Sequence, residues 1–151
     1  MGAVRLIALG NEFRRDDGVG PVLVDLLRQK LPPETEIVAF NGDGAALMEV
    51  WQGASRVVVI DAVRSGAPPG TIHRLDAVSQ TIPSDFFHYS THAFSLAEAV
   101  ELARRLGRLP DELLIFGIEG SDFGAGQGLS EPVELAVRRL AAELLKQFGS
   151  E

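Results

Sequence analysis

The sequence predicts an α/β fold in a single domain, residues 1–151, with a mostly parallel twisted sheet, helices on both faces and an antiparallel strand at one edge. Strand-like and helix-like segments alternate along most of the chain, which is the pattern of a parallel sheet with crossover helices. Residues 57–60 (VVVI) form an uninterrupted apolar run, as in a central parallel strand buried on both faces. Residues 65–70 (SGAPPG) form a tight turn between two strands, which predicts the antiparallel edge strand.

The first half of the chain is expected to supply three strands and two helices. Residues 4–9 (VRLIAL) predict the first strand and residues 36–40 (EIVAF) the second. A helix between them opens at Gly20-Pro21, because proline in the first turn has no N–H to lose. A short helix over residues 45–52 then leads to the apolar third strand.

The second half is expected to supply two more strands and two longer helices. Residues 71–75 (TIHRL) predict the edge strand, and residues 113–118 predict another buried strand. The helix before that buried strand has a capping box, with Ser95 as N-cap and Glu98 three positions later. Ser130 is expected to cap the last helix, which follows a glycine-rich loop.

Composition and charge narrow the possible functions. The chain has no cysteine, so it can hold neither a disulfide nor a thiolate metal site or nucleophile. Its net charge of −7 disfavours nucleic acid and anionic membranes as partners. No apolar run approaches the roughly 18 residues that a membrane span needs. The chain enters a strand almost at once, so we expect no signal peptide and a soluble, cytoplasmic monomer.

Acidic residues lie where ligands bind in this type of fold, at the carboxyl ends of the strands. Asp16 and Asp17 stand after the first strand and just before a helix. Helix capping would explain one acid, since free N–H groups and the helix dipole stabilise a carboxylate there. It does not require two adjacent carboxylates, which repel each other, so a ligand role stays open beside the capping role.

A possible metal site combines Asp17 with two residues from other loops. Asp61 directly follows the apolar run, where it either caps a turn or points into the crevice at the sheet edge; we favour the second role. His92 precedes the capped helix, and a lone histidine is more often structural or exposed. Two carboxylates and one imidazole, however, suit nickel, zinc or iron. His73 lies in a strand pattern and His88 in a loop, without such company.

The common hydrolase signatures are absent. The chain contains no H-E-x-x-H, no G-x-S-x-G and no phosphate-binding G-x-x-x-x-G-K-[ST] motif. Asp43 lies between two glycines after the second strand. Turn formation explains Asp43 fully, but its place on the same sheet edge keeps it as a catalytic candidate.

Several short motifs follow one another in a fixed order along nearly the whole chain. They are Gly10-Asn11, Asp16-Asp17-Gly18 with Gly20, residues 58–62 (VVIDA), Ser90-Thr91-His92, residues 117–119 (GIE) and residues 128–130 (GLS). Together and in this order, these motifs are similar to those of the hydrogenase maturation endopeptidases.

The resemblance implies an aspartyl-type endopeptidase that removes the C-terminal extension of a nickel–iron hydrogenase large-subunit precursor after nickel insertion. The metal-contacting positions of the family fall on Asp17, Asp61 and His92, the first of which is often glutamate. The nickel is the substrate's own and not a permanent cofactor. Many members carry Asp-Gly-Gly after the second strand, whereas this chain reads Asn-Gly-Asp-Gly. Either Asp43 acts with Asp17 in catalysis from a shifted register, which is the assignment we adopt, or the catalytic role lies elsewhere.

Two alternatives from other classes fit part of the pattern. A receiver-type signalling domain also has an acid pair after its first strand and a phosphoacceptor like Asp61, but it needs a lysine beyond its last strand. The only lysines are Lys30 and Lys146, and neither is there. A nucleotide-binding module would explain the glycine-rich loops, but the acidic strand ends would repel phosphate.

Overall fold

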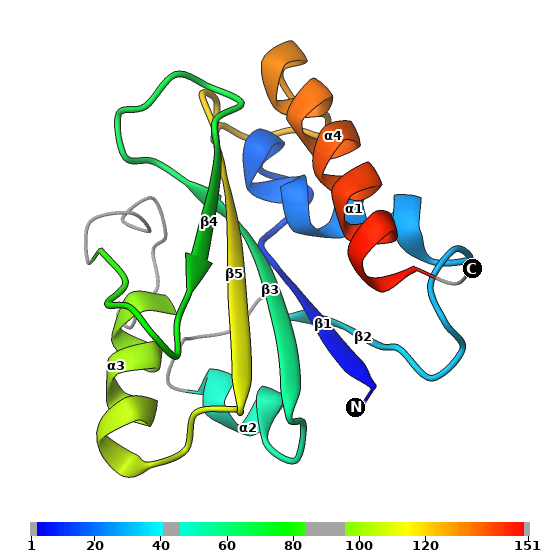
Figure 1. Ribbon diagram of the computed structural model, residues 1–151. Helices are drawn as coiled ribbons and strands as arrows, with labels where there is room; N and C mark the ends of the chain where they lie inside the picture. Colours follow the sequence, from blue (N-terminus) through cyan, green and yellow to red (C-terminus); the bar gives the residue numbers. More distant parts are fainter. Residues whose placement is uncertain (1–2, 41–45, 84–95, 150–151) are drawn as a thin grey trace.

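The computed structural model describes residues 3–40, 46–83 and 96–149, which form one mixed sheet with helices around it (Figure 1). The strands of the described chain are β1 (Val4–Leu9), β2 (Glu36–Phe40), β3 (Arg56–Val63), β4 (Ile72–Asp76) and β5 (Glu112–Glu119). Its helices are the 3-10 helix η1 (Arg15–Gly18) and the α-helices α1 (Val19–Leu27), α2 (Leu47–Trp51), α3 (Leu96–Leu106) and α4 (Glu131–Phe148).

The sheet has the order β2-β1-β3-β5-β4, and the predicted mixture of directions is confirmed. β1 pairs in parallel with β2 and β3, and β3 pairs in parallel with β5. Among the described strands, only β4, at the edge, runs antiparallel to its neighbour β5. The short connection from β3 to β4 contains no crossover helix, which is the physical reason for the reversal.

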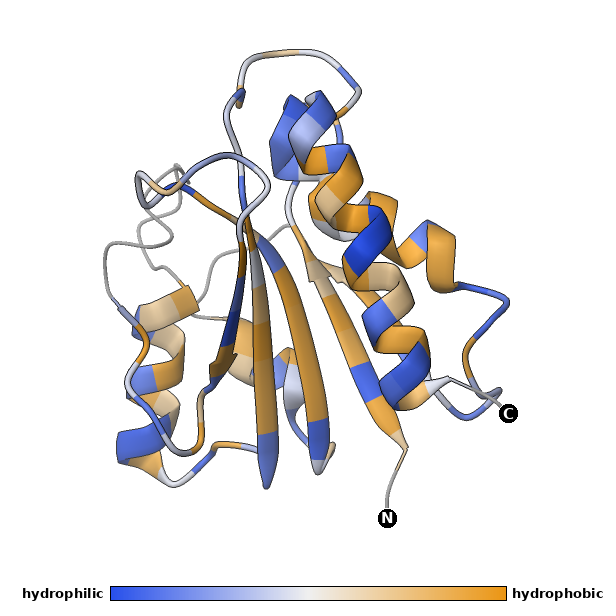
Figure 2. Cartoon of the chain, turned by 45° about the horizontal axis from the view of Figure 1, so that its top comes forward, coloured by the Kyte–Doolittle hydropathy of each residue, from blue (hydrophilic) through white to orange (hydrophobic). Residues whose placement is uncertain are grey.

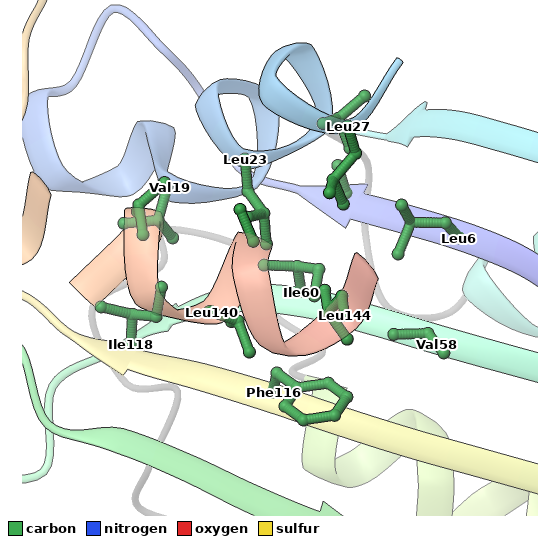
Figure 3. Close-up of a cluster of buried hydrophobic side chains, with 14 of the residues drawn as sticks. Leu6, Val19, Leu23, Leu27, Val58, Ile60, Phe116, Ile118, Leu140 and Leu144 are labelled. Carbon is green, nitrogen blue, oxygen red and sulfur yellow. The ribbon is translucent and has the colours of Figure 1, made fainter. Parts of the chain in front are cut away.

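Helices cover both faces of the sheet, as the sequence predicts. α1 and α4 lie side by side on one face, while α2 and α3 pack together on the other (Figure 1). Figure 3 shows the first of the two cores, where apolar side chains of α1 and α4 meet those of the strands. Labelled members of this core include Leu6, Leu23, Ile60, Phe116 and Leu140, all at most 4% exposed.

The central strand is buried on both faces. Val58 and Ile60 belong to the core under α1 and α4, whereas Val57 and Val59 belong to the core under α2 and α3. Successive side chains of a strand point to opposite faces, so both faces of β3 must be apolar. Figure 2 shows this as hydrophobic colour along most of the length of the middle strands, while α4 alternates between hydrophobic and hydrophilic residues.

Three local predictions need correction. The third strand runs from Arg56 to Val63, beyond the predicted residues 57–60, because β5 continues to pair with it up to Glu119. The first helical segment starts earlier than Gly20-Pro21, since η1 and Val19 precede them. Ser130 stands at the N-cap of α4, but its side chain makes no capping hydrogen bond.

Within the described ranges, none of the helices combines the length and the apolar character that crossing a membrane requires.

Candidate active site

The candidate site lies where the connections of the sheet change direction. The chain leaves β1 for β2 on one side, and it then returns to place β3 on the other side of β1. In open α/β sheets, ligands bind outside the carboxyl ends of the strands at such a switch point. Neighbouring strands are about 4.8 Å apart, so residues at the ends of β1 and β3 are close together.

Asp17 is folded back onto the end of β1. The backbone N–H of Asn11 donates to Asp17 Oδ2 at 3.0 Å, and the side chain is only 7% exposed. Gly10 makes this fold-back possible: its φ is +115°, and a Cβ atom there would lie 2.1 Å from the Asp17 backbone oxygen. η1, which carries Asp17, also contacts β3. The predicted ligand Asp17 therefore sits at the switch point.

Asp61 lies inside β3 and not after it, which corrects the sequence interpretation. β1 pairs with β3 only as far as Ile60, whereas β5 continues past Asp61. Asp61 is therefore at the point where β1 has ended. It is 4% exposed, and its Oδ1 accepts the N–H of Ala62 at 2.8 Å. Alternation along the strand directs its side chain to the face that carries α2 and α3.

Asp16 has a different role from its neighbour Asp17. Its fully buried carboxylate accepts hydrogen bonds from the backbone N–H groups of Ser121, Asp122 and Ser130 and from the hydroxyls of Ser121 and Ser130, at 2.8 to 3.3 Å. Burial alone would raise the pKa of this carboxyl, but these hydrogen bonds outweigh burial and lower it. Asp16 thus anchors the glycine-rich loop, and it is neither a helix cap nor an available ligand.

The same two loops are also joined by backbone contacts. Arg15, whose φ is +50°, donates its N–H to the Gly126 oxygen at 2.9 Å, and Gly126 donates to the Phe13 oxygen at 2.9 Å. The loop after β1 and the loop after β5 therefore form one connected rim at the carboxyl end of the sheet.

Glu119, at the end of β5, is a buried acid that sequence reasoning did not select. It is 1% exposed and accepts hydrogen bonds from the backbone N–H and hydroxyl of Ser65, at 2.7 and 2.6 Å, and from the N–H of Gly66. His73 Nε2 lies 3.1 Å from Glu119 Oε1, so His73 does have an acidic neighbour. The signal that selected Asp61, an acid at the end of a buried strand, would have found Glu119 too.

Two predicted site residues, His92 and Asp43, lie outside the described residues, as does the predicted N-cap Ser95. Within residues 3–40, 46–83 and 96–149, no group of three or more histidine, cysteine or acidic side chains is placed to hold a metal ion. The described chain therefore supplies two of the three predicted metal-contacting residues, Asp17 on η1 and Asp61 on β3.

The buried polar side chains of the described chain are Asp16, Asp17, Asp61 and Glu119. All four are carboxylates at the carboxyl ends of β1, β3 and β5. Asp16 and Glu119 are used to hold loops in place, whereas Asp17 and Asp61 stand at the switch point. Buried carboxylates there can bind a cation or exchange a proton with a substrate. The carboxyl edge of the sheet is therefore the candidate active site.

Comparison with known proteins gives the family. The hydrogenase maturation protease family model matches residues 22–147. The hydrogenase expression/formation protein HupD of Thiocapsa roseopersicina is 30% identical over 97% of this chain and 69% of its own length. HoxM of Azotobacter vinelandii is 31% identical over 97% of this chain and 73% of its own.

Solved structures share the fold. The hydrogenase maturating endopeptidase HybD of E. coli has a TM-score of 0.77 at 22% identity, over 96% of this chain and 91% of that one. The [NiFe] hydrogenase maturation protease HybD of Thermococcus kodakarensis has a TM-score of 0.73 at 24% identity, over 97% and 99%.

The chain belongs to the hydrogenase maturation protease family, and it is an endopeptidase. The expectation from the sequence motifs is confirmed. The receiver-type signalling domain and the nucleotide-binding module are not supported.

Proposed function

We propose that this endopeptidase removes the C-terminal extension of a nickel–iron hydrogenase large-subunit precursor, and that it does so only after nickel has been inserted. The single observation that carries this proposal is the pair of buried carboxylates, Asp17 and Asp61, at the switch point of the sheet. The names of relatives support the substrate, since the HybD protein of Thermococcus kodakarensis is called a [NiFe] hydrogenase maturation protease.

In this proposal Asp17, Asp61 and His92 contact the substrate's nickel. Alternation along β3 directs Asp61 to the face of the sheet on which α3 packs. Val63 on β3 and Leu96 at the start of α3 belong to the same buried cluster. His92 precedes Leu96 by four residues in the sequence, which supports assigning all three side chains to one site.

The proposed ligand set explains why the metal would come with the substrate. A structural zinc site has four protein ligands. A catalytic zinc site has three protein ligands, most of which are usually histidine or cysteine. Two carboxylates and one histidine would hold a divalent ion weakly by themselves. Nickel already bound in the precursor would instead dock the extension against the enzyme. Such positioning can lower a barrier by roughly 7–11 kcal/mol.

Catalysis is assigned to Asp17 and Asp43 as an aspartyl-type mechanism. Asp17 is buried, which suits a group that exchanges a proton with the reacting peptide. Asp43 follows β2, the neighbour of β1, and it would act from the same edge of the sheet. We further propose that the enzyme acts as a cytoplasmic monomer without nucleic acid or membrane, consistent with its net charge of −7.

The test is to incubate the purified enzyme with precursor large subunit, with and without nickel, and to follow loss of the extension by mass spectrometry. Rapid cleavage of the nickel-loaded precursor and near-absence of cleavage of the nickel-free precursor are expected. Equal rates on the two forms would refute recognition of nickel. Size-exclusion chromatography in the same buffer tests the monomeric state.

A further inference from the structure

The rim of the candidate site carries two arginines that form no ion pair within the described residues, Arg14 and Arg64. Each lies three residues from a candidate ligand: Arg14 precedes Asp17, and Arg64 follows Asp61. Other arginines, such as Arg5, do pair with carboxylates. Arg105 on α3 also lacks an ion pair in the described chain, so what sets Arg14 and Arg64 apart is their position beside two acidic candidate ligands, in a chain with a net charge of −7.

Arg14 and Arg64 come from different loops, and both lie beside Phe123. A guanidinium nitrogen of Arg14 donates to the backbone oxygen of Phe123 at 3.3 Å, and the Arg64 guanidinium lies 5.8 Å from the centre of the Phe123 ring. Phe123 therefore brings the two positive charges to the same part of the rim. An anion at this part of the rim would be attracted by both positive charges.

The two carboxylates that anchor loops, Asp16 and Glu119, do not serve as partners for Arg14 and Arg64. Asp16 is surrounded by donors from Ser121, Asp122 and Ser130, and Glu119 by donors from the β3–β4 connection and from His73. Neither acid forms an ion pair with an arginine of the described chain. Arg64 is exposed, and Arg14 is partly exposed, so both can reach an incoming group.

We propose that Arg14 and Arg64 bind a carboxylate on the C-terminal extension of the precursor, and thereby determine which extensions are cleaved; this inference rests on the proposed function. The planar guanidinium forms paired hydrogen bonds with a carboxylate. Phe13, beside Arg14 in the chain, is 59% exposed and offers the same extension an apolar contact. The carboxylate would orient the extension while the nickel holds the body of the precursor.

The experiment measures kcat and KM on nickel-loaded precursor for the wild type, Arg14→Gln, Arg64→Gln and the control Arg105→Gln. Arg105 is an exposed arginine in the last turn of α3, distant from the rim and likewise without an ion pair in the described chain. We expect each rim variant to lose about tenfold in kcat/KM, mainly through KM, which is the size of one charge-assisted hydrogen bond. The Arg105 variant should match the wild type.

Substrate variants show which carboxylate is bound. In one precursor the acidic side chains of the extension become amides, and in another the terminal carboxylate is amidated. With wild-type enzyme, the precursor that lacks the bound carboxylate should show the same tenfold loss in kcat/KM, about the size of one charge-assisted hydrogen bond. Combining that precursor with the Arg64→Gln variant should cause no further loss. If the rim variants cleave as fast as the wild type, and if neutralised extensions are cleaved as fast as charged ones, the carboxylate site is overturned while the proposed function stays intact. Equal losses for Arg64→Gln on charged and neutral extensions would also overturn it.

Discussion

The Asp16 carboxylate accepts both the backbone N–H and the hydroxyl of Ser130 at 2.8 Å, although 114 residues separate the two in the sequence. Ser130 is the residue before α4, and its hydroxyl is used for Asp16 instead of the helix N-terminus. One carboxylate thus ties the loop after β1 to the loop after β5. Both loops border the candidate site, so its shape depends on this contact.

Replacing Asp16 by Asn should destabilise the protein by on the order of 3 kcal/mol, because the amide cannot serve all the donors that the carboxylate accepts. The lowered pKa of Asp16 makes this contribution dependent on pH. It is fully present above the unfolded value of about 3.9 and is lost as the pH falls through the lower folded pKa. Urea unfolding at pH 7, 5 and 3.5 measures it. If the free energy of unfolding differs by the same amount between wild type and variant at all three pH values, the negative charge of Asp16 does not contribute to the anchoring.

Gly10→Ala should displace Asp17 and lower both stability and activity. Its added Cβ would lie 2.1 Å from the Asp17 backbone oxygen, and φ is +115°. Gly53→Ala is the matched control, since φ is +86° there but no atom lies within 4 Å of the new Cβ. We expect thermal unfolding to show a larger loss for Gly10→Ala, with loss of processing in that variant alone. Equal effects would mean that the close approach to Asp17 is unimportant.

Asp61→Asn should abolish processing of the precursor while leaving the fold intact, because the amide keeps the shape of the side chain and removes the charge that a cation needs. Asp25→Asn, at an exposed position on α1, is the control and should be fully active. Processing is followed by mass and folding by circular dichroism. Full activity of the Asp61→Asn variant would remove Asp61 from the site.

A crystal soaked in cadmium or nickel should show one ion in contact with Asp17, Asp61 and His92. For first-row metals, ligand distances are expected near 2.0–2.2 Å for oxygen and nitrogen. Isothermal titration should give only weak binding, which Asp17→Asn weakens further. An ion bound elsewhere, or side chains more than about 8 Å apart without a hinge, would exclude a shared site.

Glu119→Gln should loosen the connection between β3 and β4. Glu119 accepts both the N–H and the hydroxyl of Ser65, so the loss of charge should cost about 1.5–3 kcal/mol. A double-mutant cycle with Ser65→Ala measures the pair directly by urea unfolding. We expect a coupling of at least about 0.5 kcal/mol, as is usual for residues in contact. Strict additivity of the two changes would show that the pair contributes no coupling.

Much of this protein is determined locally by its sequence. The apolar run around Val58 predicts a central strand, because only a strand buried on both faces tolerates unbroken apolar side chains. The short turn before β4 predicts its reversed direction, and an acid after a buried apolar run selects Asp61 as a candidate site residue. The order of the motifs was enough to indicate the family that the comparisons then established. The strand, turn and acid signals each depend on residues that are neighbours along the chain, whereas the resemblance depends on motifs in order from Gly10 to Ser130.

The tertiary structure decided what the individual acids do. The sequence shows Asp16 and Asp17 as an equivalent pair, yet the donors that occupy Asp16 come from residues 121–130. Glu119 and His73 meet only because β4 pairs antiparallel with β5, and Arg14 and Arg64 meet only through Phe123. Asp16 is an anchor because five donors surround its carboxylate. Those donors lie far away in the sequence, and the topology of the sheet brings them together.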